Sequence, residues 1–417
     1  MTSEIKTMDN FDFNGKTVLV RLDLNSPLDE NNEITDDRRF LSHHDTLKEL
    51  INKDAKIVVI AHQSRPGKSD FTTMEKHAKH LSKILNHPVT YNETLFGNFA
   101  RESIKNLNNR EILMLENVRF DSEEIFEFSE ESDGVCPYEK KADTHLVRKL
   151  SSVIDIYIND AFGTAHRCQP SIVGFPRVVP SCAGRLMEKE LDILNGVISN
   201  PEKPVTFVLG GAKADDSIEV ARRALENGAN KILVGGIVGN IFLAARYWIG
   251  DASINVIKEN KMLDQIDIAG ELFKRYRNKI VMPSDVAVEM DGKRIEISVE
   301  ELTVDSHPAK DCPIIDIGGK TIAEYKNIIN NSKTVLANAV MGFVEKENFN
   351  IGTYEILKTI ADSSAFSVLG GGSTVAVARK LGLDDQFDWM STGGGASMEV
   401  LAGKKLPAVE ALRKAKC

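Results

Sequence analysis

The amino-acid sequence predicts an α/β fold with two doubly wound parallel-sheet (Rossmann-like) domains joined by a hinge helix. The first observation is length, because 417 residues exceed the roughly 250–300 that one hydrophobic core serves. The second is that short β-branched runs alternate with longer amphipathic stretches, as in βαβ units with right-handed crossovers. The third is that these runs are almost continuously apolar, as parallel strands covered on both faces are.

Nine apolar runs are the expected strands, four in the first half of the chain and five in the second. They span residues 17–25, 56–62, 111–117, 153–160, 204–210, 231–236, 314–318, 334–341 and 366–372. Helical patterns lie between them, for example over residues 37–50 and 216–227. We expect all nine runs to join parallel sheets, because each has the apolar character of a strand buried on both faces.

The two halves differ in the residues that come directly after their strands, and this difference predicts two domains with different ligands. Charged residues come after the strands of the first half, and glycines after those of the second. Pro176 and Pro180 precede a helical pattern that runs through Leu194. We therefore expect a first domain over residues 1–183, a hinge helix over 184–200 and a second domain over 201–395.

Composition narrows the class of protein. Lys and Arg total 52 against 61 Asp and Glu, and the net charge of −9 disfavours non-specific binding to nucleic acid. Residues 1–13 lack an apolar core, and Asn240 and Arg246 interrupt the longest apolar stretch, residues 232–250. We therefore expect neither a signal peptide nor a membrane span. Five widely spaced cysteines without a C-x-x-C pair fit a reducing cytoplasm and no structural zinc site.

Arginine residues recur at or near the ends of the first-half strands. The side chains in question are Asp23, Asn25, Arg39, His62, Arg65, Arg119 and Arg167. In open α/β sheets ligands bind outside the carboxyl ends of strands, and the planar guanidinium fork suits phosphate and carboxylate. Four converging arginines would bind a small, multiply anionic molecule. The alternative is that each arginine is a solvated surface charge or a salt-bridge partner.

Glycine-rich turns follow strands in the second half. They are residues 210–213, 370–374 and 391–396, and the first ends in Lys213. Backbone N–H groups at such turns and at helix N-termini bind phosphate. A single turn of this kind is explained better as a tight βα connection, but three in one half-chain favour a nucleotide.

Other motifs fail. The Gly-Lys-Ser/Thr tripeptides at residues 15–17, 67–69 and 319–321 lack the earlier glycine that a phosphate-binding P-loop requires. His77 and His80 lie one helical turn apart, where a solvated surface explains them better than a metal site.

Two features leave alternatives open. Cys168, beside Arg167, is either an activated thiolate or an unreactive cysteine. The acidic stretch of residues 122–133 has the composition of a surface loop or insertion.

Taken in order, these segments resemble phosphoglycerate kinases from about residue 15 to about residue 412. The matching segments are residues 18–29, 36–40, 61–66, 115–120, 157–167, 186–191, 208–213, 318–322, 341–345, 369–374 and 391–407. The resemblance implies an N-terminal domain for 3-phosphoglycerate and a C-terminal domain for the magnesium–nucleotide complex. It also implies that residues 396–417 form a tail that returns to the N-terminal domain.

The resemblance assigns roles residue by residue. The implied phosphoglycerate-binding residues are Asp23, Leu24, Asn25, Arg39, His62, Gln63, Ser64, Arg65, Arg119 and Arg167. The implied nucleotide-binding residues are Gly211, Ala212, Lys213, Gly236, Asn338, Glu345, Gly371, Gly372, Ser373 and Thr374. Those implied to act on the transferring phosphoryl group are Arg39, Lys213, Gly372 and Gly395.

The sequence also departs from the bacterial and eukaryotic pattern. Ser217 stands where that pattern has a second lysine, and Ser373 where it has an aspartate that helps to hold the metal. The run from Asp215 to Ser217 resembles the archaeal branch. The protein ligand of Mg²⁺ therefore stays unassigned, with Asp215 and Asp216 as candidates, because Mg²⁺ needs only one or two carboxylates beside phosphates and waters.

The resemblance implies a monomeric enzyme of glycolysis and gluconeogenesis. It would transfer a phosphoryl group in line and reversibly between 1,3-bisphosphoglycerate and ADP, giving 3-phosphoglycerate and ATP, as the hinge closes. Two alternatives stay open. One is a non-catalytic sensor of nucleotides and anions, which the serines at positions 217 and 373 favour. The other is a kinase for a different phosphorylated acid, which the altered Gln63–Ser64 loop favours.

Overall fold

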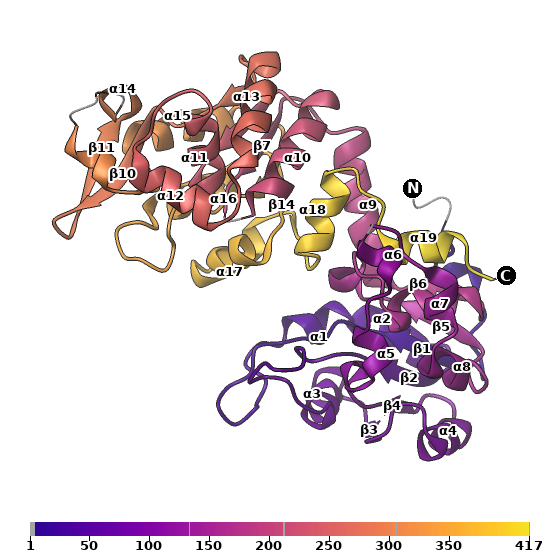
Figure 1. Cartoon of the computed structure of the whole chain (residues 1–417). Helices are drawn as coiled ribbons and strands as arrows, with labels where there is room; N and C mark the ends of the chain where they lie inside the picture. Colours follow the sequence, from indigo (N-terminus) through magenta and orange to yellow (C-terminus); the bar gives the residue numbers. More distant parts are fainter. Residues whose placement is uncertain (1–4, 133, 212, 303, 305–306, 417) are drawn as a thin grey trace. The chain divides into compact units, whose positions relative to one another are not determined.

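The protein separates into two compact units, each with its own parallel sheet (Figure 1). The structure is a computed structural model that describes residues 5–132, 134–211, 213–302, 304 and 307–416. Unit 1 comprises Met1–Ile193 and Lys405–Cys417, and unit 2 comprises Leu194–Lys404. Residues 396–404 thus group with unit 2 and not with the expected tail, because α18 (Gly395–Leu401) packs against α10 (Ala214–Glu226).

Unit 1 is built on a six-stranded sheet in the order β3-β4-β2-β1-β5-β6, in which every neighbouring pair is parallel. Its strands are β1 (Thr17–Arg21), β2 (Lys56–Ile60), β3 (Val89–Tyr91), β4 (Ile112–Met114), β5 (Ile156–Asn159) and β6 (Ser181–Ala183). The four expected strands are therefore confirmed. The two that the sequence did not reveal, β3 and β6, are three-residue strands at the sheet edges, too short to form an apolar run.

Helices cover both faces of this sheet, which makes unit 1 doubly wound. They are α1 (Arg38–Ser42), α2 (His44–Asn52), α3 (Glu75–Leu85), α4 (Asn98–Lys105), α5 (Ser122–Ile125), α6 (Ser129–Ser132), α7 (Tyr138–Ala142), α8 (His145–Leu150), the first part of α9 (Arg185–Ser199) and α19 (Pro407–Arg413). Val18 and Val20 point into one core cluster with α2 and α3, whereas Leu19 points into the opposite cluster with α4 and α8. This alternation follows from the two-residue period of a strand.

The expected helix over residues 37–50 is interrupted. It forms as two helices, α1 and α2, that meet at His43. The buried His43 ring accepts a hydrogen bond from the Asp23 amide at 3.0 Å and lies 2.7 Å from the Asp160 carboxylate. These tertiary contacts hold His43 at the junction, and no local signal in the sequence shows them.

Unit 2 contains a second six-stranded parallel sheet in the order β15-β14-β13-β7-β8-β9. Its strands are β7 (Val205–Leu209), β8 (Lys231–Val234), β9 (Ile280–Val281), β13 (Thr334–Asn338), β14 (Phe366–Leu369) and β15 (Trp389–Met390). The helices of unit 2 are the end of α9, α10, α11 (Gly236–Ala244), α12 (Asp251–Glu259), α13 (Asp264–Tyr276), α14 (Val299–Leu302), α15 (Gly319–Asn330), α16 (Ile351–Asp362), α17 (Gly372–Lys380) and α18.

One expected parallel strand belongs elsewhere. The run at residues 314–318 forms β12 (Ile314–Ile317), which pairs antiparallel with β10 (Asp285–Met290) in a separate sheet of order β11-β10-β12. The strands β10 and β11 (Lys293–Ser298) form a hairpin through Asp291 and Gly292, both with positive φ. An Asp-Gly pair between alternating runs is a hairpin signal, so the sequence held this information.

The structure corrects the expectations for His77 and for the loop at residues 122–133, and it decides between the two alternatives for Cys168. His77 is buried in the core beside Phe40 and is not solvated, because α3 packs that face against the sheet. The acidic stretch forms short helices that bury Glu124 to 1% exposure. Cys136 and Cys168 form a disulfide with Cα atoms 5.6 Å apart, which rules out the alternative of an activated thiolate at Cys168.

The disulfide closes across 32 residues of sequence, and it departs from the expectation of reduced cysteines throughout. The fold of unit 1 brings together two positions whose separation in the sequence is no guide to their distance. None of the described helices is both long and apolar enough to cross a membrane.

Candidate active site

The charged residues that follow the strands of unit 1 meet at one edge of its sheet. Because β1, β2, β4 and β5 run parallel, their carboxyl ends lie on the same side, and the loops after them begin there. Asp23 follows β1, His62 follows β2, Arg119 follows β4 and Arg167 follows β5. Their charges act on one another's pKa values, so the structure brings the expected cluster together.

Asp23 and Arg39 form an ion pair at this edge. The Arg39 guanidinium, from α1, contacts the Asp23 carboxylate, which is itself almost fully buried. Burial alone would raise the pKa of Asp23, but the charges of Arg39 and Arg21 lower it well below its usual range. Asp23 is therefore a carboxylate at every physiological pH, and it holds Arg39 while leaving it 36% exposed.

His62 is a neutral ring within a cationic cluster. Its side chain is 3% exposed, and its Nδ1 lies 3.2 Å from Nη2 of the buried Arg21. Burial, and then the charge of Arg21, lower the pKa of His62 well below its usual value. The ring can therefore donate a hydrogen bond from one nitrogen only.

Arg119 and Arg167 make the cluster strongly electropositive. Arg119 contacts the Ser64 carbonyl and is 7% exposed, whereas Arg167 is exposed. Burial, and then the charge of Arg167, lower the pKa of Arg119 to about 10. Like charges held this close destabilise one another unless an anion lies between them. The cluster therefore has the electrostatics of an anion site.

The loop after β2 connects this cluster to the residue after β1. Asn25 Oδ1 accepts a 2.7 Å hydrogen bond from the amide of Ser64, which has a positive φ of 54°. The buried Gln63 amide bonds to both backbone groups of Ser26. Gln63 and the buried Leu24 therefore turn their side chains inward, and only their backbone is available to a ligand. Arg65 is exposed on the same loop.

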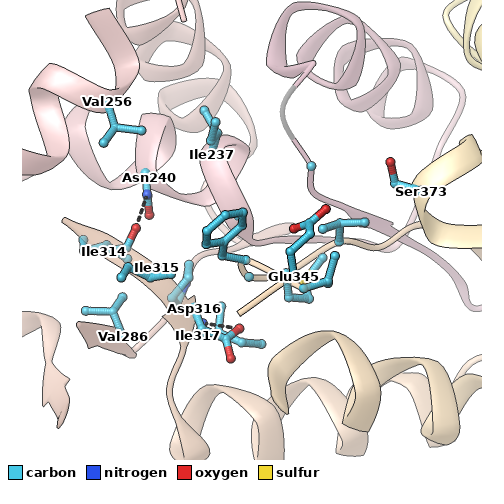
Figure 2. Close-up of a pocket in the computed structure, with 18 residues that line it drawn as sticks. Ile237, Asn240, Val256, Val286, Ile314, Ile315, Asp316, Ile317, Glu345 and Ser373 are labelled. Carbon is cyan, nitrogen blue, oxygen red and sulfur yellow. Dashed lines mark hydrogen bonds between the residues drawn. The ribbon is translucent and has the colours of Figure 1, made fainter. Parts of the chain in front are cut away.

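Unit 2 contains a cavity of about 350 Å³, within the size range of small-molecule sites (Figure 2). Four of the expected nucleotide-binding residues line it, namely Gly211, Gly236, Glu345 and Ser373. In Figure 2 the apolar side chains of Val256 and Val286 lie on one side, and Glu345 and Ser373 on the other.

Two glycines allow the chain to pass closely at the wall of this cavity. A Cβ on Gly236, whose φ is +56°, would lie 2.7 Å from the Val340 carbonyl oxygen. A Cβ on Gly210 would lie 2.3 Å from the same oxygen. The Gly211 amide instead donates to that carbonyl at 2.7 Å. The strand ends thus pack backbone against backbone, which no larger residue permits.

The N-terminus of α17 faces the end of β13. Thr374 accepts from the Ala339 amide at 3.0 Å and donates to Asn338 Oδ1 at 3.2 Å. Gly371 precedes the helix with a φ of +81°, and Gly372 and Ser373 are exposed in its first turn. Asn338 and Thr374 therefore hold this turn in place, while the exposed Gly372 and Ser373 remain open to an anion.

The start of α10 carries the remaining candidates. Lys213 and Asp215 are exposed, and Asp216 lies 3.4 Å from the ammonium of Lys404. Ser217 is fully buried with an unpartnered hydroxyl in the described part of the chain, so this side chain is not exposed to a ligand. Ala212 lies outside the described residues. Gly395 is the first residue of α18.

The donor set near α10 suits a cation that arrives with phosphates. In the described ranges, no group of three or more His, Cys, Asp or Glu is placed to hold a metal ion. Isolated carboxylates such as Asp215 of α10 are oxygen donors that Mg²⁺ accepts when phosphate supplies the others, and Ser373 offers a hydroxyl separately, in the first turn of α17.

The third Gly-Lys-Thr tripeptide is not an anion site. The Asp285 carboxylate occupies the N-terminus of α15, accepting from the Lys320 amide at 3.0 Å and the Thr321 amide at 2.7 Å. The protein's own carboxylate thus satisfies the backbone groups that a phosphate would need.

The apolar lining of the cavity was missed by sequence reasoning. It includes Ile237 of α11, the three isoleucines of β12 and residues 340–344 after β13, with Asn240 and Asp316 as polar groups among them. Asn240 donates to the Ile314 carbonyl at 3.2 Å, which fixes the antiparallel sheet against α11. The Asp-Gly signal indicated the β10–β11 hairpin, but no local signal in the sequence placed β12 beside it.

Comparison with known proteins gives a consistent result. The sequence profile described as "Phosphoglycerate kinase" matches residues 8–404. A phosphoglycerate kinase of Methanothermobacter thermautotrophicus is 48% identical over 416 residues, covering 99% of this chain and 98% of that protein. One of Natronomonas pharaonis is 43% identical over 413 residues, covering 98% and 100%.

Solved structures agree. The crystal structure of phosphoglycerate kinase from Pyrococcus horikoshii is similar with a TM-score of 0.87 and 41% identity, covering 98% of both chains. A solved structure of phosphoglycerate kinase from Coxiella burnetii has a TM-score of 0.79 and 30% identity, covering 99% of this chain and 100% of that one. The relatives at the higher identities are archaeal, as the departures at Ser217 and Ser373 suggested. By profile, sequence and fold together, the chain belongs to the phosphoglycerate kinase family.

Proposed function

We propose that this chain catalyses the reversible transfer of a phosphoryl group between 1,3-bisphosphoglycerate and ADP, giving 3-phosphoglycerate and ATP. The observation that carries the proposal is the presence, in one chain of this family, of an arginine cluster at the edge of one sheet and a nucleotide-sized cavity beside the other. A multiply charged acid phosphate suits the first, and a flat base with a polyphosphate suits the second.

In unit 1, the phosphoglycerate would bind to the arginine cluster. Arg119, Arg167 and Arg65 would neutralise its phosphate and carboxylate, while Asn25, Ser64 and the backbone of Leu24 and Gln63 would shape the pocket. Arg39, which stays partly exposed on Asp23, would face the transferring phosphoryl group. His62 would donate one hydrogen bond to the ligand.

In unit 2, the nucleotide base would lie in the apolar part of the cavity, with its phosphates toward the glycine turns. Lys213 and the backbone amides at Gly372 and Gly395 would hold the transferring phosphoryl group. Glu345 and Asn338 would bind beside the ribose and phosphates. Mg²⁺, bound through Asp215 or Asp216 and the nucleotide phosphates, would neutralise charge on the oxygens.

The chemistry needs no covalent intermediate. The β-phosphate oxygen of ADP carries no proton at neutral pH, so its bond to phosphorus forms as the acyl–phosphate bond breaks and a carboxylate leaves. Catalysis then rests on positioning and charge neutralisation. Because the two ligands would bind to different units, transfer requires a step that brings them together, which a hinge over residues 184–200 would permit.

The test is phosphotransfer by the purified protein from Mg-ATP to 3-phosphoglycerate. The acyl phosphate is reduced by a coupling enzyme, and NADH oxidation is recorded. Turnover that vanishes without Mg²⁺ is the expected result. Nucleotide binding without turnover would instead support a sensor. Turnover with another phosphorylated acid, but not with 3-phosphoglycerate, would support a different acceptor.

A further inference from the structure

A buried chain of polar contacts connects the acidic stretch to the arginine cluster, and all of it lies inside unit 1. We propose that Glu124 is a positioning residue for His62. It acts through Ser171 and Arg21, and it keeps the proton of the His62 ring on Nε2, where the ring serves as a hydrogen-bond donor. This inference rests on the proposed function, in which His62 binds the phosphoglycerate.

The chain of polar contacts begins at Glu124, a carboxylate whose burial needs an explanation. Glu124 lies on α5 and is 1% exposed, although Glu123 and Glu127 on either side of it are not buried. Burial raises the pKa of Glu124, and the charge of Arg21 with two hydrogen bonds from Ser171 opposes that rise. An unpaired carboxylate in this position would be strongly destabilising, so its partners matter.

Ser171 determines which groups in this chain of polar contacts donate hydrogen bonds and which accept them. Its backbone amide donates to Glu124 at 2.9 Å, and its hydroxyl donates to the other carboxylate oxygen at 2.6 Å. A hydroxyl has one proton, and Ser171 donates it to Glu124. The Ser171 oxygen can therefore only accept a hydrogen bond from its other partner. That partner is Nε of Arg21, at 2.9 Å.

Arg21 is the last residue of β1, and it carries the effect to the ring. It is fully buried, and its Nη1 donates a hydrogen bond to the Leu22 carbonyl. Its Nη2 lies 3.2 Å from His62 Nδ1. A guanidinium only donates, so Nδ1 must accept and the single ring proton of neutral His62 must be on Nε2.

Glu124 also supplies the counter-charge that Arg21 needs. The fully buried guanidinium has its pKa lowered by burial and raised most by Glu124. Without this carboxylate, Asp23, which already pairs with Arg39, would be the remaining carboxylate among the described residues acting on the buried Arg21, with the charges of Arg119 and Arg167 nearby. We therefore expect Arg21 to lose its fixed orientation when the contact through Ser171 is removed.

The variants are chosen to separate the contact from the charge. Ser171→Ala removes the contact while Glu124 keeps its charge, and Ser171→Thr restores a hydroxyl. Glu124→Gln removes the charge. Glu127→Gln makes the same change in charge on an exposed side chain near the end of α5, and it serves as the matched control.

The first readout is the tautomer of His62, from ¹⁵N resonances of histidine-labelled full-length protein near neutral pH. The unliganded wild type should show a protonated Nε2 and an unprotonated Nδ1, and Glu127→Gln should match it. Ser171→Ala and Glu124→Gln should show a mixture of both tautomers, and Ser171→Thr should recover the wild-type pattern. A single unchanged tautomer in Ser171→Ala would overturn the proposal.

The second readout is kinetic. Loss of one oriented hydrogen bond predicts a rise of about tenfold in KM for 3-phosphoglycerate in Ser171→Ala, with KM for ATP unchanged. Equal effects on both substrates would mean a merely structural role and would contradict the proposal. Because the tautomer is read without turnover, a wild type that shows the expected tautomer but no phosphotransfer would refute the proposed function alone.

Discussion

Among single side chains, Arg39 makes the sharpest prediction. Arg39→Ala should lower kcat about 10³-fold, because one cationic contact to a transferring phosphoryl group is worth that much in related chemistry. ADP affinity should stay the same, since Arg39 belongs to unit 1 and the cavity to unit 2. Steady-state kinetics with nucleotide titration measure both.

The control for this change is its neighbour in α1. Arg38 is also partly exposed, but its guanidinium pairs with Asp36 and lies outside the cluster. Arg38→Ala should therefore retain kcat within about twofold. Near-normal turnover in Arg39→Ala, or an equal loss in both variants, would contradict the role given to Arg39.

His77 predicts how stability depends on pH. Burial, and then the charge of His80, lower the pKa of His77 to about 4, against 6.5 for an ordinary histidine. The unfolded chain therefore takes up a proton that the folded protein refuses, so this contribution to stability is present above pH 6.5 and is lost as the pH falls toward 4. At pH 5 the loss amounts to about 2 kcal/mol.

Urea unfolding of unit 1, followed between pH 7.5 and pH 5, measures this loss. Because His62 also titrates low, the relevant quantity is the difference between the wild type and His77→Gln, which keeps a donor for Gln63 but cannot be protonated. Between pH 7.5 and pH 5, His77→Gln should lose about 2 kcal/mol less of its free energy of unfolding than the wild type does. If the free energy of unfolding fell equally with pH in both proteins, the pKa of His77 would not be lowered in the folded state.

The central strands of the two parallel sheets were predicted from the sequence, whereas their short edge strands were not. The central strands of both sheets carry long apolar runs and were all expected. The missed parallel strands, β3, β6, β9 and β15, lie at sheet edges with two or three residues each. An edge strand has one pairing neighbour and needs little apolar sequence, so its existence depends on that neighbour.

At the turn from β8 into α11, we expect Gly236→Ala to weaken both ADP binding and the stability of unit 2. A Cβ in Gly236→Ala would meet the Val340 carbonyl oxygen at 2.7 Å on a backbone with positive φ. The wall of the cavity must then move, so ADP affinity should fall at least about tenfold, and unit 2 should lose about 2–3 kcal/mol. Calorimetric titration and denaturant unfolding give the two values.

Gly382→Ala separates strain from close approach. Gly382 also has a positive φ, of +69°, but a Cβ there would meet nothing within 4 Å. It should lose about 1 kcal/mol of stability and retain its ADP affinity. Equal affinities in the two variants would mean that the close packing at Gly236 does not shape the cavity.

For the chain as a whole, the division into units predicts where each ligand protects the backbone. Hydrogen exchange with ADP at 100 times its dissociation constant should slow local opening around α11 and β12 by up to about 2.7 kcal/mol. 3-Phosphoglycerate should instead protect the loops after β1 and β2. If ADP protected only unit 1, the assignment of the cavity would be wrong.

Much of this protein can be recognised in its sequence alone. The alternation of buried runs and amphipathic stretches determines two α/β units, because burial on both faces demands continuous apolar strands. Parallel strands share one carboxyl edge, so the charged residues after β1, β2, β4 and β5 could be grouped before any distance was known. The ordered motifs then pointed to the family.

The tertiary structure decided what depends on contacts between distant residues. It buried Glu124 and His77, whose local sequence is polar, because their partners Ser171 and Gln63 come from other elements. It also paired Cys136 with Cys168 and placed β12 over the nucleotide cavity. Sequence periodicity reports which face of an element is apolar, whereas the partner of a buried polar group is chosen only when the chain has folded.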